Sequence, residues 1–121
     1  MPRSSFKNQY AIDKRLYESK RILKRYPDRI PIICKQSKNN HLPILNKVKY
    51  LVPPNLTIGQ FICVIRSRLK LGSEVALFVT VEGFIPSSLA ILGELYENSK
   101  HIDGFLYIEY CQENTFGSHL L

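Results

Sequence analysis

One well-marked helix in the middle of the chain restricts the possible folds most. Thr57 and Gln60 stand at the spacing of a capping box, in which each side chain bonds a backbone amide of the other residue. A helix is predicted from there to about Leu71, with Gly72 as its C-terminal cap. Its core-facing stripe is expected to be Ile58, Ile62, Ile65 and Leu69.

Short apolar segments on both sides of this helix have the composition of strands. They are residues 30–34 and 48–52 before it and residues 75–81 and 105–111 after it. Pro31 predicts that the first segment lies at a sheet edge or that the proline stands at the strand start. Alternation in the second segment directs Lys49 and Leu51 to one face and Tyr50 and Val52 to the other.

The remaining elements complete a recognisable order. A helix is predicted over 11–26, ended by Pro27, and a short helix is predicted from near Ser88 to Tyr96. The order helix, strand, strand, helix, strand, short helix, strand predicts an α+β fold, a ubiquitin-like β-grasp with an N-terminal helical extension. A mixed ferredoxin-like sandwich is the structural alternative.

Charge is distributed unevenly along the chain. The formal net charge is +7, but residues 1–49 carry a local +10 and residues 50–121 a local −3. This asymmetry predicts an acidic partner for the N-terminal half, either a peptide, a nucleic acid or an anionic membrane surface. No apolar run approaches the ~20 residues that span a membrane.

Cysteine and histidine usage gives no sign of catalysis or metal binding. Cys34, Cys63 and Cys111 lack metal-ligand spacing and stand in apolar segments, so we expect reduced core thiols in a cytosolic protein. We also find no phosphate-binding loop and no motif of paired carboxylates. The chain is therefore predicted not to be an enzyme and to need no cofactor or metal.

A second apolar stripe on the central helix has two interpretations. Phe61 and Val64, followed by Arg68 one turn later, lie beside the core-facing stripe. They either widen the core face or present an apolar patch to a partner.

Five segments, taken together, resemble the ubiquitin-like autophagy modifiers of the GABARAP type. They are D28-R-I-P-I-I-C34, K47-V-K-Y-L-V-P53, L56-T-I-G-Q-F61, D103-G-F-L-Y107 and E113-N-T-F-G117, in order and with compatible spacing over nearly the whole chain. The resemblance implies a ubiquitin-like core preceded by two short N-terminal helices.

The resemblance also implies a maturation pathway. A cysteine protease trims such precursors after a glycine, and E1-like and E2-like enzymes join that glycine to phosphatidylethanolamine on autophagic membranes. Here the glycine is Gly117, preceded by Phe116. A single domain would comprise a basic extension (1–27), a β-grasp core (28–111) and a conjugation tail (112–117), followed by a removable propeptide (118–121). We expect a cytoplasmic protein that reaches the autophagosome membrane after lipidation, and with it the vacuole or lysosome.

Finally, the resemblance implies a groove for receptor peptides of the form W/F/Y-x-x-L/I/V with acidic flanks. The aromatic pocket is expected to comprise Glu18, Ile22, Pro31, Ile33, Lys49, Leu51 and Phe105. The aliphatic pocket is expected to comprise Tyr50, Val52, Pro53, Leu56, Phe61 and Val64. The acidic flanks are expected to meet Arg29, Lys47, Lys49 and Arg68.

Several residues depart from the family pattern. Lys35, Ile44 and Asn46, with His41, replace acidic or polar residues and make one rim more basic and more apolar. Thr80 stands at a position where the family commonly has an aromatic residue, which puts a second docking surface of the family in doubt. The alternative function is a basic β-grasp module that binds RNA or anionic lipid directly; no nucleic acid is expected in the leading interpretation.

Overall fold

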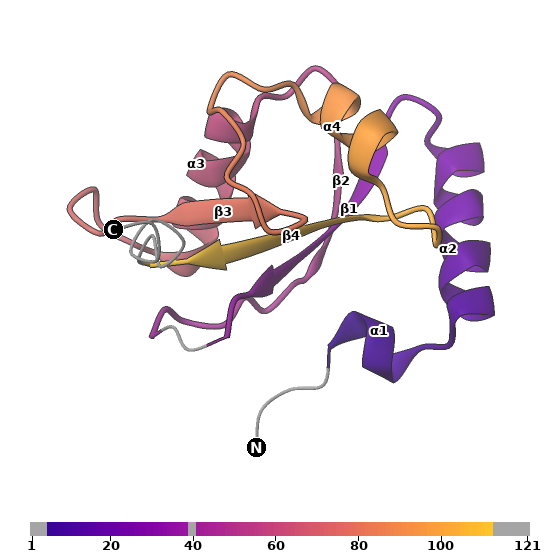
Figure 1. The fold of residues 1–121 in the computed structure, drawn as a ribbon, viewed down its shortest axis with the longest axis horizontal. Helices are drawn as coiled ribbons and strands as arrows, with labels where there is room; N and C mark the ends of the chain where they lie inside the picture. Colours follow the sequence, from indigo (N-terminus) through magenta and orange to yellow (C-terminus); the bar gives the residue numbers. More distant parts are fainter. Residues whose placement is uncertain (1–4, 39–40, 113–121) are drawn as a thin grey trace.

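A computed structural model describes residues 5–38 and 41–112 (Figure 1). Its elements are α1 (Phe6–Gln9), α2 (Ile12–Arg25), β1 (Ile30–Gln36), β2 (Lys49–Val52), α3 (Ile58–Leu69), β3 (Phe78–Val81), α4 (Leu92–Ser99) and β4 (Leu106–Cys111). The predicted order of elements is confirmed. The short helix α1 was implied only by the family resemblance.

The strands form one mixed sheet in the order β2-β1-β4-β3. β1 pairs antiparallel with β2 and parallel with β4, and β3 pairs antiparallel with β4. Because side chains alternate along a strand, β1 serves two apolar clusters. Ile32 and Cys34 join the main core with α3, whereas Ile33 joins a smaller cluster with Phe6 and Ile22 of the N-terminal helices.

The edge position considered for Pro31 is wrong, and its strand-start position is confirmed. β1 lies inside the sheet, between β2 and β4. Pro31 is its second residue and pairs with Leu51, and the parallel ladder to β4 begins only at Ile32. The missing proline amide is therefore tolerated at the start of the strand.

Three predicted boundaries are wrong because side-chain and backbone hydrogen bonds hold the flanking residues in turns. α3 ends at Leu69, and its C-terminal cap is Lys70, which takes the left-handed conformation at φ 57°, instead of the predicted Gly72. Arg66 then donates to the carbonyls of Gly72 and Val75, which delays β3 to Phe78. Likewise, the amides of Ile58 and Gly59 donate to the carbonyls of Ala90 and Ser88. Ser88 and Leu89 form a turn and Ile91 is extended, so α4 starts only at Leu92.

The buried face of α3 differs from the predicted stripe by one position. The capping box is confirmed, with the Gln60 amide 3.1 Å from Thr57 Oγ1 and the Thr57 amide 2.9 Å from Gln60 Oε1. However, Phe61 is fully buried and Ile62 only partly so. Phe61 thus belongs to the core face, and Val64 at its flank is 38% exposed.

The cysteine prediction is confirmed for two positions and wrong for the third. Cys34 and Cys111 are buried, whereas Cys63 is exposed on α3. No cluster of His, Cys, Asp or Glu within 5–38 and 41–112 could hold a metal ion. In the same ranges, none of the helices is long and apolar enough to cross a membrane.

Candidate functional site

The edge strand β2 places the two predicted pocket sets on opposite sides of itself. Lys49 and Leu51 are partly exposed, and Tyr50 and Val52 are buried, which confirms the predicted alternation. In the described sheet, β2 pairs only with β1. Its outer edge therefore offers backbone groups to which an extended peptide could add as a further strand.

The aromatic-pocket residues are assembled by the N-terminal helices. Ile22, Ile33 and Phe105 pack together, with Leu51 partly buried against them. Pro31 pairs with Leu51 across the sheet and is buried. All residues of the set lie in α2, in β1, in β2 or directly before β4: Glu18, Ile22, Pro31, Ile33, Lys49, Leu51 and Phe105.

Three contacts complete this region. Phe6, which the sequence reasoning missed, lies edge-on to Phe105 with ring centroids 5.2 Å apart. Lys49 pairs with Glu18, a contact that links β2 to α2, and its ammonium lies 5.7 Å from the Phe6 ring. The only sequence signal for Phe6 was an aromatic residue in an otherwise polar N-terminal stretch.

The aliphatic-pocket set is partly core. Tyr50, Val52 and Phe61 belong to the main core, and the Tyr50 and Phe61 rings meet edge-to-face at 5.9 Å. Leu56, Pro53 and Val64 are the members with exposed surface. The second apolar stripe of α3 therefore combines the two interpretations given for it: Phe61 widens the core face, and Val64 remains accessible to a partner.

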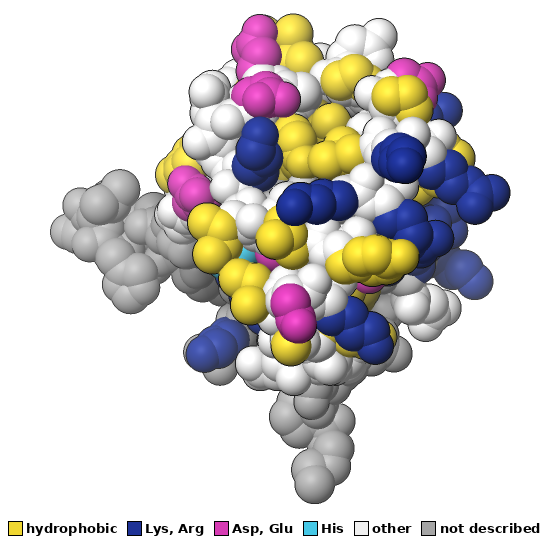
Figure 2. All heavy atoms as spheres, turned by 90° about the vertical axis from the view of Figure 1, so that its right-hand side faces the viewer, with side chains coloured by type: hydrophobic (Ala, Val, Ile, Leu, Met, Phe, Trp, Pro, Cys, Tyr) yellow, Lys and Arg dark blue, Asp and Glu magenta, His cyan; other side chains and the backbone are white. Residues whose placement is uncertain are grey.

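Cationic side chains surround these positions. Arg29, Lys47 and Arg68 are exposed, and the Lys47 ammonium lies 5.6 Å from the Tyr50 ring centroid. Burial raises the pKa of Tyr50 to about 12, although nearby Arg68 acts in the opposite direction. Figure 2 shows the α2 side of the molecule, where Lys and Arg side chains lie among exposed hydrophobic ones.

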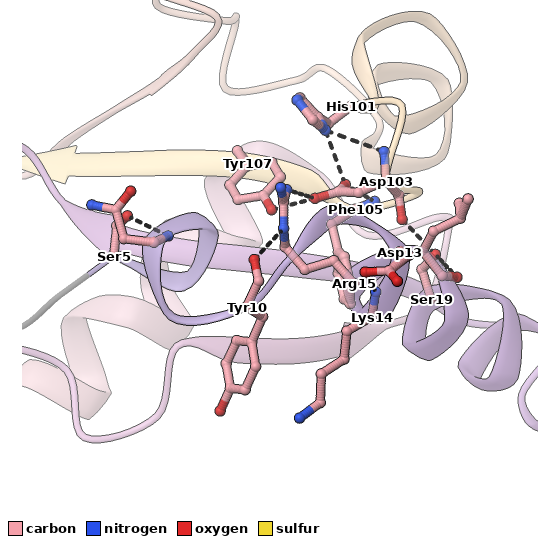
Figure 3. A network of polar contacts seen from close by, with 12 residues as sticks. Ser5, Tyr10, Asp13, Lys14, Arg15, Ser19, His101, Asp103, Phe105 and Tyr107 are labelled. Atoms are coloured by element: carbon pink, nitrogen blue, oxygen red, sulfur yellow. Dashed lines mark hydrogen bonds and ion pairs between the residues drawn. The ribbon is translucent and has the colours of Figure 1, made fainter.

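A buried carboxylate fixes α2 against the core (Figure 3). Asp103 has no exposed side-chain surface and accepts from Arg15 of α2 at 2.6 Å. Tyr107 donates to the same carboxylate, and the Phe105 amide donates to its other oxygen at 2.9 Å. The network therefore connects α2 directly to the residue that forms the floor of the aromatic set.

The turn around Asp103 is also held from both sides. Ser19 Oγ of α2 donates to the Asp103 carbonyl at 2.6 Å, and Tyr96 Oη of α4 donates to the Gly104 carbonyl at 2.7 Å. Gly104 has φ +89°, and a Cβ there would lie 2.2 Å from Ser19 Oγ. The predicted turn at Asp103 and Gly104 thus has a second function, since it admits close approach of α2.

Electrostatics favour the charged form of Asp103. Burial raises the pKa of this carboxyl, but hydrogen bonds from Tyr107, from the Phe105 amide and from Arg15 outweigh burial, and the net shift is downward. The pKa of Tyr107 is raised by burial and by its bond to Asp103. At neutral pH the network therefore contains a carboxylate, a guanidinium and a neutral phenol.

Two residues predicted to be chemically central, Phe116 and Gly117, lie outside the described residues. Thr80 is described: it is buried in β3 and pairs with Glu109 of β4. His41 and Asn46 are exposed in the segment before β2.

Comparison with known proteins gives consistent matches over this architecture. The family described as "Autophagy protein Atg8 ubiquitin like" matches residues 14–117. "Autophagy-related protein 8" of Mycosarcoma maydis is 49% identical over 95% of this chain and 98% of its own length. "Autophagy-related protein 8a" of Arabidopsis thaliana is 48% identical over 98% of this chain and 97% of its own. A crystal structure of Trypanosoma brucei ATG8 superposes with a TM-score of 0.85 at 37% identity, covering 91% of this chain and 95% of that one.

The first prediction concerns the buried ion pair. Asp103→Asn should lower the free energy of unfolding by about 3–5 kcal/mol at neutral pH, because it leaves the Arg15 charge buried without its counter-ion. Urea unfolding measures this, with Glu97→Gln as the control. Glu97 pairs with Lys100 at the surface, and its loss should cost at most about 1 kcal/mol.

The difference in unfolding free energy between the parent chain and Asp103→Asn should depend on pH, because the pKa of Asp103 is lowered in the folded state. Its contribution is present above the unfolded-state pKa of about 3.9 and is lost as the pH falls toward the lower folded-state value. The gap between the parent chain and Asp103→Asn should therefore narrow below about pH 4. If the difference in unfolding free energy stayed constant down to strongly acidic pH, the assignment of an ionised Asp103 in the folded protein would be contradicted.

The second prediction separates close packing from backbone strain at Gly104. Gly83 and Gly104 both have positive φ, at +82° and +89°, but a Cβ at Gly83 meets nothing within 4 Å. Both alanine variants should lose roughly 1–2 kcal/mol to the left-handed conformation. Gly104→Ala should lose more, and amide exchange in α2 should accelerate only in that variant. If both variants lose the same stability and amide exchange in α2 is unchanged, the prediction is wrong, and Ser19 moves aside from the added Cβ at no measurable cost.

Proposed function

The chain belongs to the Atg8 family of ubiquitin-like autophagy proteins and is a ubiquitin-like modifier of autophagy; we propose that it acts after trimming at Gly117 and conjugation to phosphatidylethanolamine. The observation that carries this proposal is the family match to residue 117, which includes the E113-N-T-F-G117 segment. In this role the protein is a substrate of a processing protease and of E1-like and E2-like enzymes, and is not itself an enzyme.

The chemistry suits a glycine. Without a Cβ, Gly117 can pass through a narrow catalytic channel, and its carbonyl carbon is open to attack. Protease cleavage would hydrolyse the bond to Ser118 and leave a carboxylate. The E1-like enzyme would activate this carboxylate at the expense of a nucleoside triphosphate and join it to a thiolate as a thioester. After transfer to the E2-like enzyme's thiolate, the lipid amine would attack the thioester, forming the amide and releasing the thiolate. Six residue steps lead from Cys111, the end of β4, to Gly117, and they can span roughly 20 Å.

We further propose that the groove beside β2 recruits autophagy receptors. A peptide would add as a strand to the outer edge of β2, with its aromatic residue over the Leu51 and Phe105 region and its aliphatic residue beside Leu56 and Val64. The position of β2 at the sheet edge supports this arrangement. Acidic flanking residues would meet Arg29, Lys47, Lys49 and Arg68.

This function accounts for the basic N-terminal half without direct nucleic-acid binding. Family membership also does not favour the alternative of a module for RNA or anionic lipid. The lipidated form would place the protein on the autophagosome membrane, and turnover of that membrane would deliver it to the vacuole or lysosome.

The third prediction tests processing. Incubation of the full chain with a protease of this family should reduce the intact mass by that of S118-H-L-L121, and Gly117→Ala should remain uncut and unconjugated. Mass spectrometry measures the first step, and a reconstituted conjugation reaction on phosphatidylethanolamine vesicles measures the second. An unchanged mass of the parent chain would refute cleavage at this bond.

The fourth prediction tests the groove with a W-x-x-L peptide that carries acidic flanks. Leu51→Ala should weaken binding at least about tenfold, because truncating the side chain removes apolar contact worth roughly 2 kcal/mol. Ile102→Ala is the matched control, since Ile102 is a highly exposed residue of the 101–105 turn. Fluorescence anisotropy gives both affinities. Equal affinities of the two variants would place the peptide elsewhere.

A further inference from the structure

A cavity of about 710 Å³ lies between α1, the C-terminal half of β1 and the segment that leads into β2. Its apolar lining includes Phe6, Ile33, Ile44, Leu45, Val48 and Tyr110. With the two peptide-pocket sets it shares only Ile33, and it includes neither Leu51 nor Val64. It is therefore a different site from the groove beside β2. Its volume is in the range of about 300–1,000 Å³ that is usual for sites of small ligands.

The cavity combines a packed floor with an accessible apolar rim. Ile33, Leu45 and Tyr110 of the floor are almost completely buried. At the rim, Ile44 is 58% exposed and Val48 is partly exposed. An exposed isoleucine beside a cavity favours a ligand with an apolar body, because the ligand would remove this surface from water.

Charge at the cavity is cationic. Lys35 and Lys38 line it, and no carboxylate does so among the described residues. Lys35 lies 3.5 Å from Glu109, but its side chain remains 40% exposed, and Lys38 is exposed. A ligand with a single negative head group would complement this pair of lysines.

The backbone around the cavity does not suit an added strand. On one side, β1 pairs with β4 as far as Gln36 and Tyr110. On the other side, the Cys34 amide donates to Val48 at 2.8 Å, and Gln36 Nε2 donates to the Leu42 carbonyl at 2.6 Å. A peptide would find no sheet edge at this wall, whereas an alkyl chain needs no backbone partners.

We propose that this cavity binds a long-chain fatty acid. The alkyl chain lies against Phe6, Ile44 and Val48, and the carboxylate lies at Lys38 with Lys35 nearby. The function goes beyond that of the modifier and requires neither trimming nor conjugation.

Dodecanoate below its micelle concentration tests the proposal on the full chain, with calorimetry for affinity and amide NMR shifts for location. One dodecanoate should bind per chain, with shifts centred on residues 44–48 and α1. Ile44→Asp should weaken binding at least about tenfold, since it removes apolar contact and repels the carboxylate. The matched control, Ile102→Asp, should leave the affinity unchanged.

A separate experiment tests whether the carboxylate of the ligand lies at Lys38. Lys38→Glu should weaken dodecanoate about threefold or more but leave dodecan-1-ol unaffected, and Lys100→Glu should change neither. The proposal is overturned by an absence of saturable binding, by equal effects of Ile44→Asp and Ile102→Asp, or by equal effects of Lys38→Glu on acid and alcohol. Competition by the W-x-x-L peptide, or loss of binding in Leu51→Ala, would also overturn it by placing the chain in the peptide groove. An acidic peptide that shifts residues 44–48 where dodecanoate does not would overturn it in favour of a protein partner.

Discussion

The buried carboxylate of Asp103 is the interaction on which the rest of the site depends. An ionised group without solvent contact must be compensated by charge and hydrogen bonds, and Asp103 receives both from Arg15, Tyr107 and the Phe105 amide. Because Arg15 lies on α2, satisfying this carboxylate also fixes the helix against the sheet. The electrostatic requirement of one residue thereby becomes a geometric constraint on the whole N-terminal extension.

That constraint determines what the outer face of the sheet can offer. Once α2 is fixed, Ile22 packs on Ile33 and Phe105, and Glu18 reaches Lys49 of the edge strand. The same strand gives its alternate side chains, Tyr50 and Val52, to the main core. β2 is consequently held on both faces, and within the described sheet it pairs only with β1, which is the combination that strand addition by a peptide requires.

Features set by residues close together in the sequence could be predicted, whereas features set by contacts between distant residues could not. The capping box at Thr57 and the alternation in β2 act over a few residues, and both predictions are confirmed. The pair of Arg15 and Asp103 joins positions 88 residues apart, and neither position carries a local signal for it. Tertiary packing likewise decided that Phe61 turns inward and that Cys63 stays exposed. The two residues lie on nearly opposite sides of a helix that is apolar at both positions, so only its packing against the sheet selects the buried one.

The dependence of the groove on α2 has a consequence for the function of the modifier. Phe105 is fully buried, and its amide is bonded to Asp103, so the floor of the aromatic set and the fastening of the helix are parts of one network. A change that releases α2 would expose Phe105 and separate Glu18 from Lys49, and the aromatic region would be lost while the β-grasp core, which packs through the other face of the sheet, could persist. Release of α2 alone, which abolishes peptide recognition, therefore costs less free energy than unfolding of the whole domain. The residue that controls this threshold, Asp103, has no exposed surface and so no direct access to the peptide.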